Sequence, residues 1–422
     1  MRYLFTLTIT LATCANSLFG SSLDDLIDIA MCNNPEIMAA EEELASAKAS
    51  RKQQYGSFHP QVSFESGKAF EDLNVRNENY EYGYLQTKWN LYRGGRDRAS
   101  IRISSSEQKV SQSSLCQLRN DIAYQVSWIY YDLLYLNGAL QLFDNTINAS
   151  KSYCEIAQRK FEKGITSEVD LIEFELQEES LTAARRGLET TRQRQLNRLH
   201  LLLGCIPEDI NLELAGDFVI SDQVEDVCHL YERALCQRYD RSMATEYLKI
   251  LREKYNQACG EQLPSLDLLS TYGKEPDILA DRGLGTKIYL HLSIPLYSGF
   301  AKQHKKTAAN KKVSAQCRMN QNIDNKILVE IQAALNTLKM QQEHLEAEQA
   351  IAEKNEKYWT MTKEEYQKGV KNSPDLASAA DRALQSNVRI LALKRDISQA
   401  MLDIALATGD RLAEVHMGRR NK

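Results

Sequence analysis

The chain has 422 residues, enough for about two or three domains of ordinary size. It is 43% hydrophobic and 26% charged, a composition typical of a folded protein, and its formal net charge of −5 argues against a general nucleic-acid binder. Seven prolines and 19 glycines are few for this length and favour long, uninterrupted elements. Past residue 20 no apolar run approaches the ~20 residues of a membrane helix, which excludes helical transporters and receptors but not strand-based membrane proteins.

Residues 1–20 have the order of a secretory signal peptide. One positive charge, Arg2, precedes an apolar stretch that is followed by small residues. The alternatives are a buried N-terminal element and a lipoprotein signal with Cys14 as the lipid acceptor. The cleavage point stays open among Ala15, Ser17 and Gly20.

The sequence contains an internal duplication. NLYRGG at Asn90–Gly95 matches PLYSGF at Pro295–Phe300, and FEKGITSEVDL from Phe161 matches YQKGVKNSPDL from Tyr366, both at an offset of 205. Upstream the offset is 204, so a length change of one residue separates the two sets of matches. An offset kept over so many residues indicates two structural repeats.

Each repeat is predicted to contain a helix, a β-hairpin, a long helix and a last helix. The first helix is expected from Ser22, a plausible N-cap, to Tyr55, before the helix breakers Gly56 and Pro60. In the first repeat, residues 21–215, the other elements are expected at 61–92 (hairpin), 97–163 (long helix) and 167–203 (last helix, capped by Ser167). The second repeat, residues 216–422, has its hairpin at 265–297.

Apolar residues of the helices recur every seven positions, which is typical of coiled coils. The last helix of the second repeat also carries small residues that let neighbouring helices approach closely. In the long helix the two rows are Leu115, Ile122, Ile129, Leu136 and Phe143, and Val126, Leu133, Leu140 and Ile147. In the last helix they are Leu376, Ala383, Ile390, Ile397 and Ile404, and Ala379, Ser386, Leu393, Ala400 and Ala407.

The strands alternate apolar and polar residues, so each has one apolar face. Each run has about 8–11 residues, enough to cross a bilayer when tilted. Two hairpins leave open edges, which cannot face lipid, so several copies must share one barrel, and three copies supply twelve strands. The alternative is a small soluble sheet that caps a helical bundle. The predicted membrane-facing residues are Leu85, Trp89, Leu91, Leu290, Leu292 and Ile294.

The repeated LYRGG and LYSGF motifs, the two helix-turn motifs and the duplication together resemble the TolC-like outer-membrane efflux protein family. The resemblance implies a mainly α fold with a small β part: a homotrimer whose twelve-stranded barrel in the outer membrane continues as a periplasmic α-helical coiled-coil barrel. It also implies a large periplasmic part in a Gram-negative-type envelope. The implied partners are outer-membrane lipid, a periplasmic adaptor protein, and an inner-membrane pump or ABC transporter.

The same resemblance implies a gated periplasmic tip at the turns around Gly164 and Gly369. The constricting aspartate lies six residues after the second glycine, which is Asp375 here. Ser378 occupies the position where a second acid is usual, and Pro374 replaces a β-branched residue. The further gate candidates are Asp170, Glu173 and Lys371, and the alternative reading of the acids is ordinary first-turn charge on a helix.

No phosphate-binding loop, nucleophile motif or metal-ligand spacing occurs, so the chain is expected to be no enzyme and to need no cofactor or metal. None of the nine cysteines forms a CxxC pair; burial on helix faces is favoured slightly over disulfides. The function expected is an outer-membrane exit duct of a tripartite efflux or type I secretion system, which conducts passively and binds no nucleic acid. The alternative is a periplasmic coiled-coil scaffold or adaptor without a pore. The cargo and the choice between efflux and secretion stay open.

Overall fold

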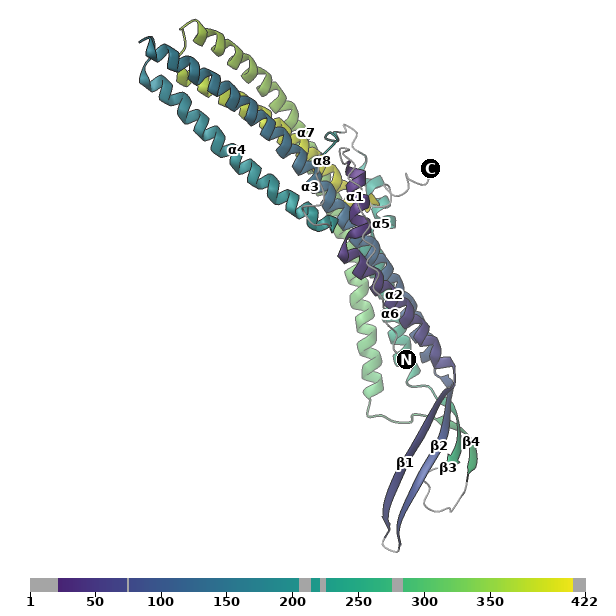
Figure 1. The fold of residues 1–422 in the computed structure, drawn as a ribbon. Helices are drawn as coiled ribbons and strands as arrows, with labels where there is room; N and C mark the ends of the chain where they lie inside the picture. The colour runs from purple at the N-terminus through teal and green to yellow at the C-terminus, as the bar shows by residue number, and fades with distance from the viewer. Residues whose placement is uncertain (1–21, 74–75, 205–213, 221–224, 275–283, 413–422) are drawn as a thin grey trace. The chain divides into compact units, whose positions relative to one another are not determined.

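The computed structural model describes residues 22–73, 76–204, 214–220, 225–274 and 284–412, so the predicted signal peptide lies outside the described residues. The two repeats have the same order of elements (Figure 1). The first contains α1 (Leu23–Asn33), α2 (Pro35–Tyr55), the 3-10 turn η1 (Gly56–Phe58), β1 (Gln61–Leu73), β2 (Arg76–Arg93), α3 (Arg96–Glu162) and α4 (Glu168–Leu203). The second contains α5 (Val227–Gln237), α6 (Tyr239–Gly260), β3 (Ser265–Lys274), β4 (Gly285–Ser293), α7 (Ala301–Gln367) and α8 (Ser373–Thr408).

The first helix of each repeat is two helices, and the prediction of one helix from Ser22 to Tyr55 was wrong. The backbone is extended at Asn34, because Pro35 disfavours the helical conformation in the residue before it. Arg238 is the equivalent of Asn34 in the second repeat, 204 positions later, and its backbone is also extended between α5 and α6. Its guanidinium donates to the Asp240 carboxylate at 2.8 Å. The Ser22 cap is confirmed: its hydroxyl accepts from the Asp25 N–H in a capping box.

The two hairpins form one four-stranded antiparallel sheet in the order β1-β2-β3-β4. Strands β2 and β3, which belong to different repeats, pair from Gly83 opposite Lys274 to Arg93 opposite Ser265. The sheet therefore joins the repeats directly, and β1 and β4 form its two edges within the described part of the chain.

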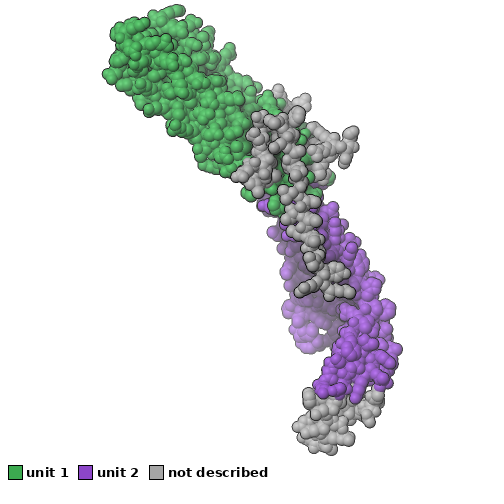
Figure 2. Space-filling view, viewed as in Figure 1, with its two compact units in different colours: residues 1–35, 119–227, 331–422 green, residues 36–118, 228–330 purple. Residues whose placement is uncertain are grey.

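The chain divides into two compact units (Figure 2). The first unit takes residues 1–35, 119–227 and 331–422, and the second takes 36–118 and 228–330. In the first unit α4, α8 and the adjoining lengths of α3 and α7 run side by side (Figure 1).

The predicted heptad rows form the core of these helices. The row that begins at Leu115 is buried as far as Leu136, and its last member, Phe143, is half-buried. The row from Val126 to Ile147 is buried at every position. On α8 the small-residue row is buried throughout, from Ala379 to Ala407. The coiled-coil prediction is thus confirmed, and the small residues lie where helices meet.

Polar pairs add specificity between the packed helices of the first unit. Arg192 Nε of α4 donates to Asn137 Oδ1 of α3 at 2.7 Å. Arg395 of α8 lies over the ring of Tyr135 with its guanidinium carbon 4.6 Å from the centroid, and pairs with Asp132 at 3.2 Å. These half-buried pairs select the register between helices more than they add stability.

In the second unit, the glycine pair of the LYRGG motif allows a close backbone crossing. Gly94 and Gly95 both have positive φ, at 61° and 78°. A Cβ added at Gly94 would meet the carbonyl oxygen of Gly260 and lie 2.9 Å from the Leu263 Cβ, whereas one added at Gly95 meets nothing within 4 Å. Glycine is therefore needed at position 94 for both the positive φ and the close contact, and at position 95 for the positive φ alone.

These two glycines allow a matched prediction. Gly95→Ala is expected to cost about 1–2 kcal/mol, the usual penalty of a left-handed non-glycine residue. Gly94→Ala carries the same penalty plus the steric clash, and is expected to cost at least about 2 kcal/mol more. Thermal denaturation of the purified variants measures the difference; equal melting temperatures would contradict the close crossing.

No helix in the described residues is long and apolar enough to cross a membrane. The seven described cysteines are free thiols, and all of them are exposed or half-buried, so the preference for burial was wrong for these seven. They lie on helices whose buried seams are filled by Leu, Ile, Val and Ala instead.

Candidate functional site: the helical turns and the apolar sheet face

The first turn joins α3 to α4 through Gly164, whose φ of 69° ends α3. Its N–H donates to the carbonyl of Phe161 at 2.8 Å. Ser167 then caps α4 as predicted: its hydroxyl accepts from the Asp170 N–H at 3.3 Å, and the Asp170 carboxylate accepts from the Ser167 N–H at 3.4 Å. This reciprocal capping box positions the Asp170 carboxylate at the start of α4.

The second turn joins α7 to α8 through Gly369, with φ of 77°. Asn372 is the N-cap of α8, and its side-chain amide oxygen accepts from the Asp375 N–H at 3.2 Å. Pro374 lies in the first turn of α8, where its missing N–H costs no helical hydrogen bond. Lys371 pairs with Asp375 at 3.7 Å, and the two side chains are 36% and 40% exposed, so the pair is weak.

Asp170 connects the two turns. One oxygen accepts from the hydroxyls of Thr166 (2.7 Å) and Ser167 (2.9 Å), and the other accepts from the Ser373 N–H at the start of α8 (3.4 Å). The Thr166 hydroxyl, followed by donors on Ser167 and Ser373, lowers the pKa of Asp170 from 3.8 to about 2. Asp170 is therefore ionised throughout the physiological range and holds the start of α8 against the first turn.

An aromatic cluster packs beneath the two turns and takes one buried residue from each of four helices. Phe174 of α4 lies edge-on to Tyr366 of α7, with centroids 5.9 Å apart, and stacks on Tyr153 of α3 at 6.2 Å. Ala157 and Leu376 complete the cluster. Its role at the tip was not predicted, although Phe174, Leu181 and Leu188 recur every seven positions and Tyr366 aligns with Phe161 between the repeats.

The other predicted gate residue, Glu173, is half-buried one turn along α4. It lines an open groove between α4 and α8 with Ser378 and Asp381. Within one copy the structure thus joins Asp170 to the second turn and Lys371 to Asp375. Glu173 instead lies in the groove beside Ser378 and Asp381, one to two turns further along α8 than Asp375. The gate assignment of these four residues stays a prediction.

Asp170→Ala is expected to lower stability by about 1 kcal/mol through loss of the cap. Because the folded pKa lies below 3.8, the carboxylate stabilises the fold above pH 3.8, and that stabilisation is lost as pH falls toward 2. The difference in melting temperature between wild type and Asp170→Asn should therefore shrink between pH 5 and 2. Glu168→Gln, at an exposed acid in the same turn, is the control and should show no such trend.

The sheet places the predicted apolar residues on one face. Cross-strand partners in an antiparallel sheet share a face. Phe64 pairs with Leu85, which pairs with Tyr272; Trp89 pairs with Leu268, which pairs with Leu290. Leu292 follows on the same face opposite Leu266.

This face is exposed in the single chain. The exposed fraction is 68% for Phe64, 60% for Leu290 and 58% for Leu292. Other large apolar residues on it are also exposed: Val62, Leu85, Trp89, Tyr92, Tyr272 and Ile288. A continuous apolar face of this kind indicates contact with an apolar phase or another molecule.

Two predicted positions differ in the structure. Leu91 is the extra residue of a β-bulge, because Asn90 pairs with Asp267 and Tyr92 with Leu266; simple alternation therefore fails there. Ile294 lies past the end of β4, so its assignment to a strand was wrong. Ser293 pairs with Ser265, the first residue of β3, and the preceding Pro264 has no N–H to continue the ladder.

Comparison with known proteins agrees with this geometry. The family model for outer membrane efflux proteins matches residues 26–205 and again residues 230–410. Protein CyaE of Bordetella pertussis is 22% identical over 312 residues, which are 70% of this chain and 65% of that relative's length. The chain thus aligns with less than two thirds of the curated relative.

Solved structures share the fold. The CmeC outer membrane channel of Campylobacter jejuni is 20% identical with a TM-score of 0.80, covering 92% of this chain and 85% of that one. The outer membrane protein VceC of Vibrio cholerae is 16% identical with a TM-score of 0.80, covering 92% and 96%.

The duplicated helical unit with its four-stranded sheet is therefore the fold of outer-membrane channel proteins. The chain belongs to the outer membrane efflux protein family. The protein is accordingly an outer-membrane protein with a large helical part, as the sequence predicted. In the described residues, no cluster of three or more His, Cys, Asp or Glu side chains could hold a metal ion.

Proposed function

We propose that the protein is the outer-membrane exit duct of a tripartite efflux or type I secretion system. It conducts passively and has no enzymatic activity. The observation that carries the proposal is the exposed apolar face of the sheet, which continues across all four strands. A scaffold without a pore has no use for such a face.

Three copies supply the twelve strands of a closed barrel. Strands β1 and β4 are the two edges of each four-stranded sheet, and lipid cannot satisfy the backbone groups that an edge leaves unpaired. Pairing β4 of one copy with β1 of the next satisfies them. The apolar face then contacts outer-membrane lipid.

The helical turns form the gate. In a trimer, three Asp375 carboxylates surround the axis and produce a field that attracts cations and excludes anions. Asp170 holds the start of α8, and hence Asp375, against the first turn of its own copy. Lys371 reduces the charge of the ring while it stays paired with Asp375.

The proposed partners supply the energy for transport. No phosphate-binding loop occurs in the sequence, so an inner-membrane pump or ABC transporter drives transport and chooses the cargo. A periplasmic adaptor connects that transporter to the turns. Contact with the adaptor moves α8 away from the first turn and widens the tip.

Purification from envelopes tests the proposal. The protein should remain in the membrane after carbonate washing, migrate as a trimer in SDS without heating, and form small-conductance pores in planar bilayers. A monomer that carbonate releases would contradict both the barrel and the duct.

A further inference from the structure

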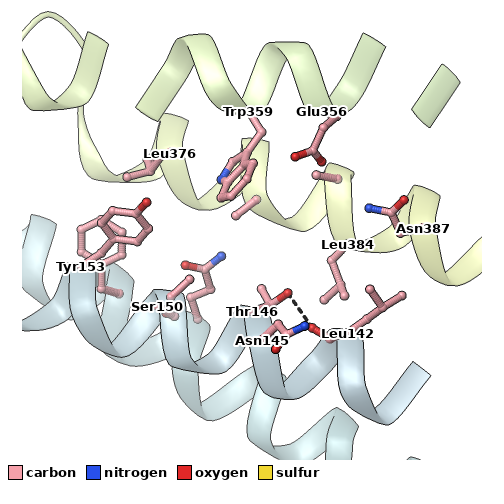
Figure 3. Close-up of a pocket in the computed structure, with 15 residues that line it drawn as sticks. Leu142, Asn145, Thr146, Ser150, Tyr153, Glu356, Trp359, Leu376, Leu384 and Asn387 are labelled. Atoms are coloured by element: carbon pink, nitrogen blue, oxygen red, sulfur yellow. Dashed lines mark hydrogen bonds between the residues drawn. The ribbon is translucent and has the colours of Figure 1, made fainter. Parts of the chain in front are cut away.

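A cavity of about 260 Å³ lies in the first unit between α3, α4, α7 and α8 (Figure 3). It adjoins the aromatic cluster, because Tyr153, Phe174 and Leu376 belong to both. A cavity of ~150 Å³ accepts a benzene ring, so this one has room for a fused bicyclic ring. It is therefore large enough for a small organic ligand.

Two polar groups in the cavity wall have no hydrogen-bond partner. Ser150 of α3 is 3% exposed, and its hydroxyl is unpaired. The indole N–H of Trp359, on α7, is also buried and unpaired. The two side chains enter the cavity from opposite sides (Figure 3). Buried donors are almost always paired in folded proteins, so their orientation indicates a missing acceptor between them.

The other residues that line the cavity determine the shape and charge of the ligand that fits it. Tyr153, Trp359 and Phe174 offer aromatic surface, and Leu142 and Leu384 offer aliphatic surface. Glu356 lines the cavity one turn of α7 before Trp359 and is itself exposed, so its carboxylate stands at the rim. These groups fit a ligand that places a cationic group at the rim and an aromatic ring with a hydrogen-bond acceptor inside the cavity.

We propose that this cavity binds a bicyclic heteroaromatic amine. The ring lies beside Tyr153 and Trp359, a ring nitrogen accepts from the Trp359 N–H, and the ammonium group pairs with Glu356. The Ser150 hydroxyl donates to the π face of the ring. All the residues that line this site belong to one copy of the chain.

Ligand binding in this cavity has a consequence for gating, which rests on the proposed function. Phe174 and Leu376 form part of the cavity wall and also pack beneath the two turns. A bound ring holds them in the spacing of the present structure. The ligand therefore stabilises the closed tip and lowers the open probability of the pore.

Intrinsic fluorescence provides a direct binding test, because the chain has three tryptophans. In a Trp89→Phe/Trp128→Phe background, Trp359 is the reporter. The probe is 2-(aminomethyl)quinoline, added to the purified full-length protein in detergent. We expect saturable quenching, and about tenfold weaker binding of 2-naphthylmethylamine, which has the same shape without the ring nitrogen. Quenching that rises linearly without saturation, or equal affinity for both probes, would overturn the proposal.

Two variants separate the site from general hydrophobic uptake. Ser150→Met fills the cavity and should abolish saturable quenching, whereas Ser152→Met, on the exposed side of the same helix, should leave it unchanged. Trp359→Phe, followed by calorimetry, should weaken quinoline binding about tenfold and leave naphthyl binding unchanged. Wild-type affinity for quinoline in Trp359→Phe would refute the site even if Ser150→Met failed to fold.

Planar-bilayer recordings test the consequence separately. With the probe present, the open probability should fall in wild type and stay constant in Ser150→Met. Saturable binding without any pore formation would retain the ligand site and refute the duct.

Discussion

Asp375→Asn should weaken block of the pore by multivalent cations by about tenfold, while anion conductance rises. One substitution removes all three carboxylates of the proposed ring, so the ring's contribution to the field at the narrowest point is lost. Asp375 is 40% exposed and forms only a weak pair with Lys371, so the fold should survive the change. The measurement is single-channel conductance in planar bilayers with a titrated trivalent cation.

Glu364→Gln provides the control for Asp375. Glu364 is exposed near the end of α7, and its neutralisation changes the net charge by the same amount. It should leave cation block unchanged. Unaltered block in Asp375→Asn would show that Asp375 is ordinary first-turn charge that the helix dipole favours.

Leu290→Arg should prevent stable insertion in the outer membrane. An arginine on a lipid-facing strand costs about 2–4 kcal/mol at the bilayer midplane, and a trimer carries it three times. Leu290 is 60% exposed on the apolar face, opposite Leu268. The readout is the amount of protein in the outer-membrane fraction and the heat-sensitive trimer band.

Tyr289→Arg is the matched control, because Tyr289 is the adjacent residue, is also exposed, and lies on the opposite face of β4. It should insert and assemble normally. Equal loss in both variants would indicate that the strand itself, and not its lipid-facing side, was damaged.

Periodicity predicted the elements well because it reflects burial directly. The heptad rows of α3 and α8 are buried or half-buried, and α3 begins and ends within one residue of the prediction. Helix caps were also predictable, since Ser22 and Ser167 act through local hydrogen bonds. The break at Asn34 was missed although Pro35 follows it. Proline is tolerated in the first turn of a helix, so Pro35 alone does not show where one helix ends and the next begins.

Register and long-range contacts could not be predicted from local patterns. The bulge at Leu91 depends on how β2 pairs with β3, more than 170 residues further along the chain. Resemblance indicated Asp170 as a gate candidate, but its bond to Ser373 requires the two turns to meet in space. The cavity depends on packing among four helices, and no spacing in the sequence indicates it.

The pairing of β2 with β3 inside one chain has a genetic consequence. Each copy arrives with its repeats already joined, so the proposed ring has a single type of junction, repeated three times. A copy whose β1 or β4 edge cannot pair prevents closure of every ring that it joins. Co-expression of equal amounts of wild-type and edge-defective copies should leave about one eighth of the rings intact, so such alleles should be dominant negative.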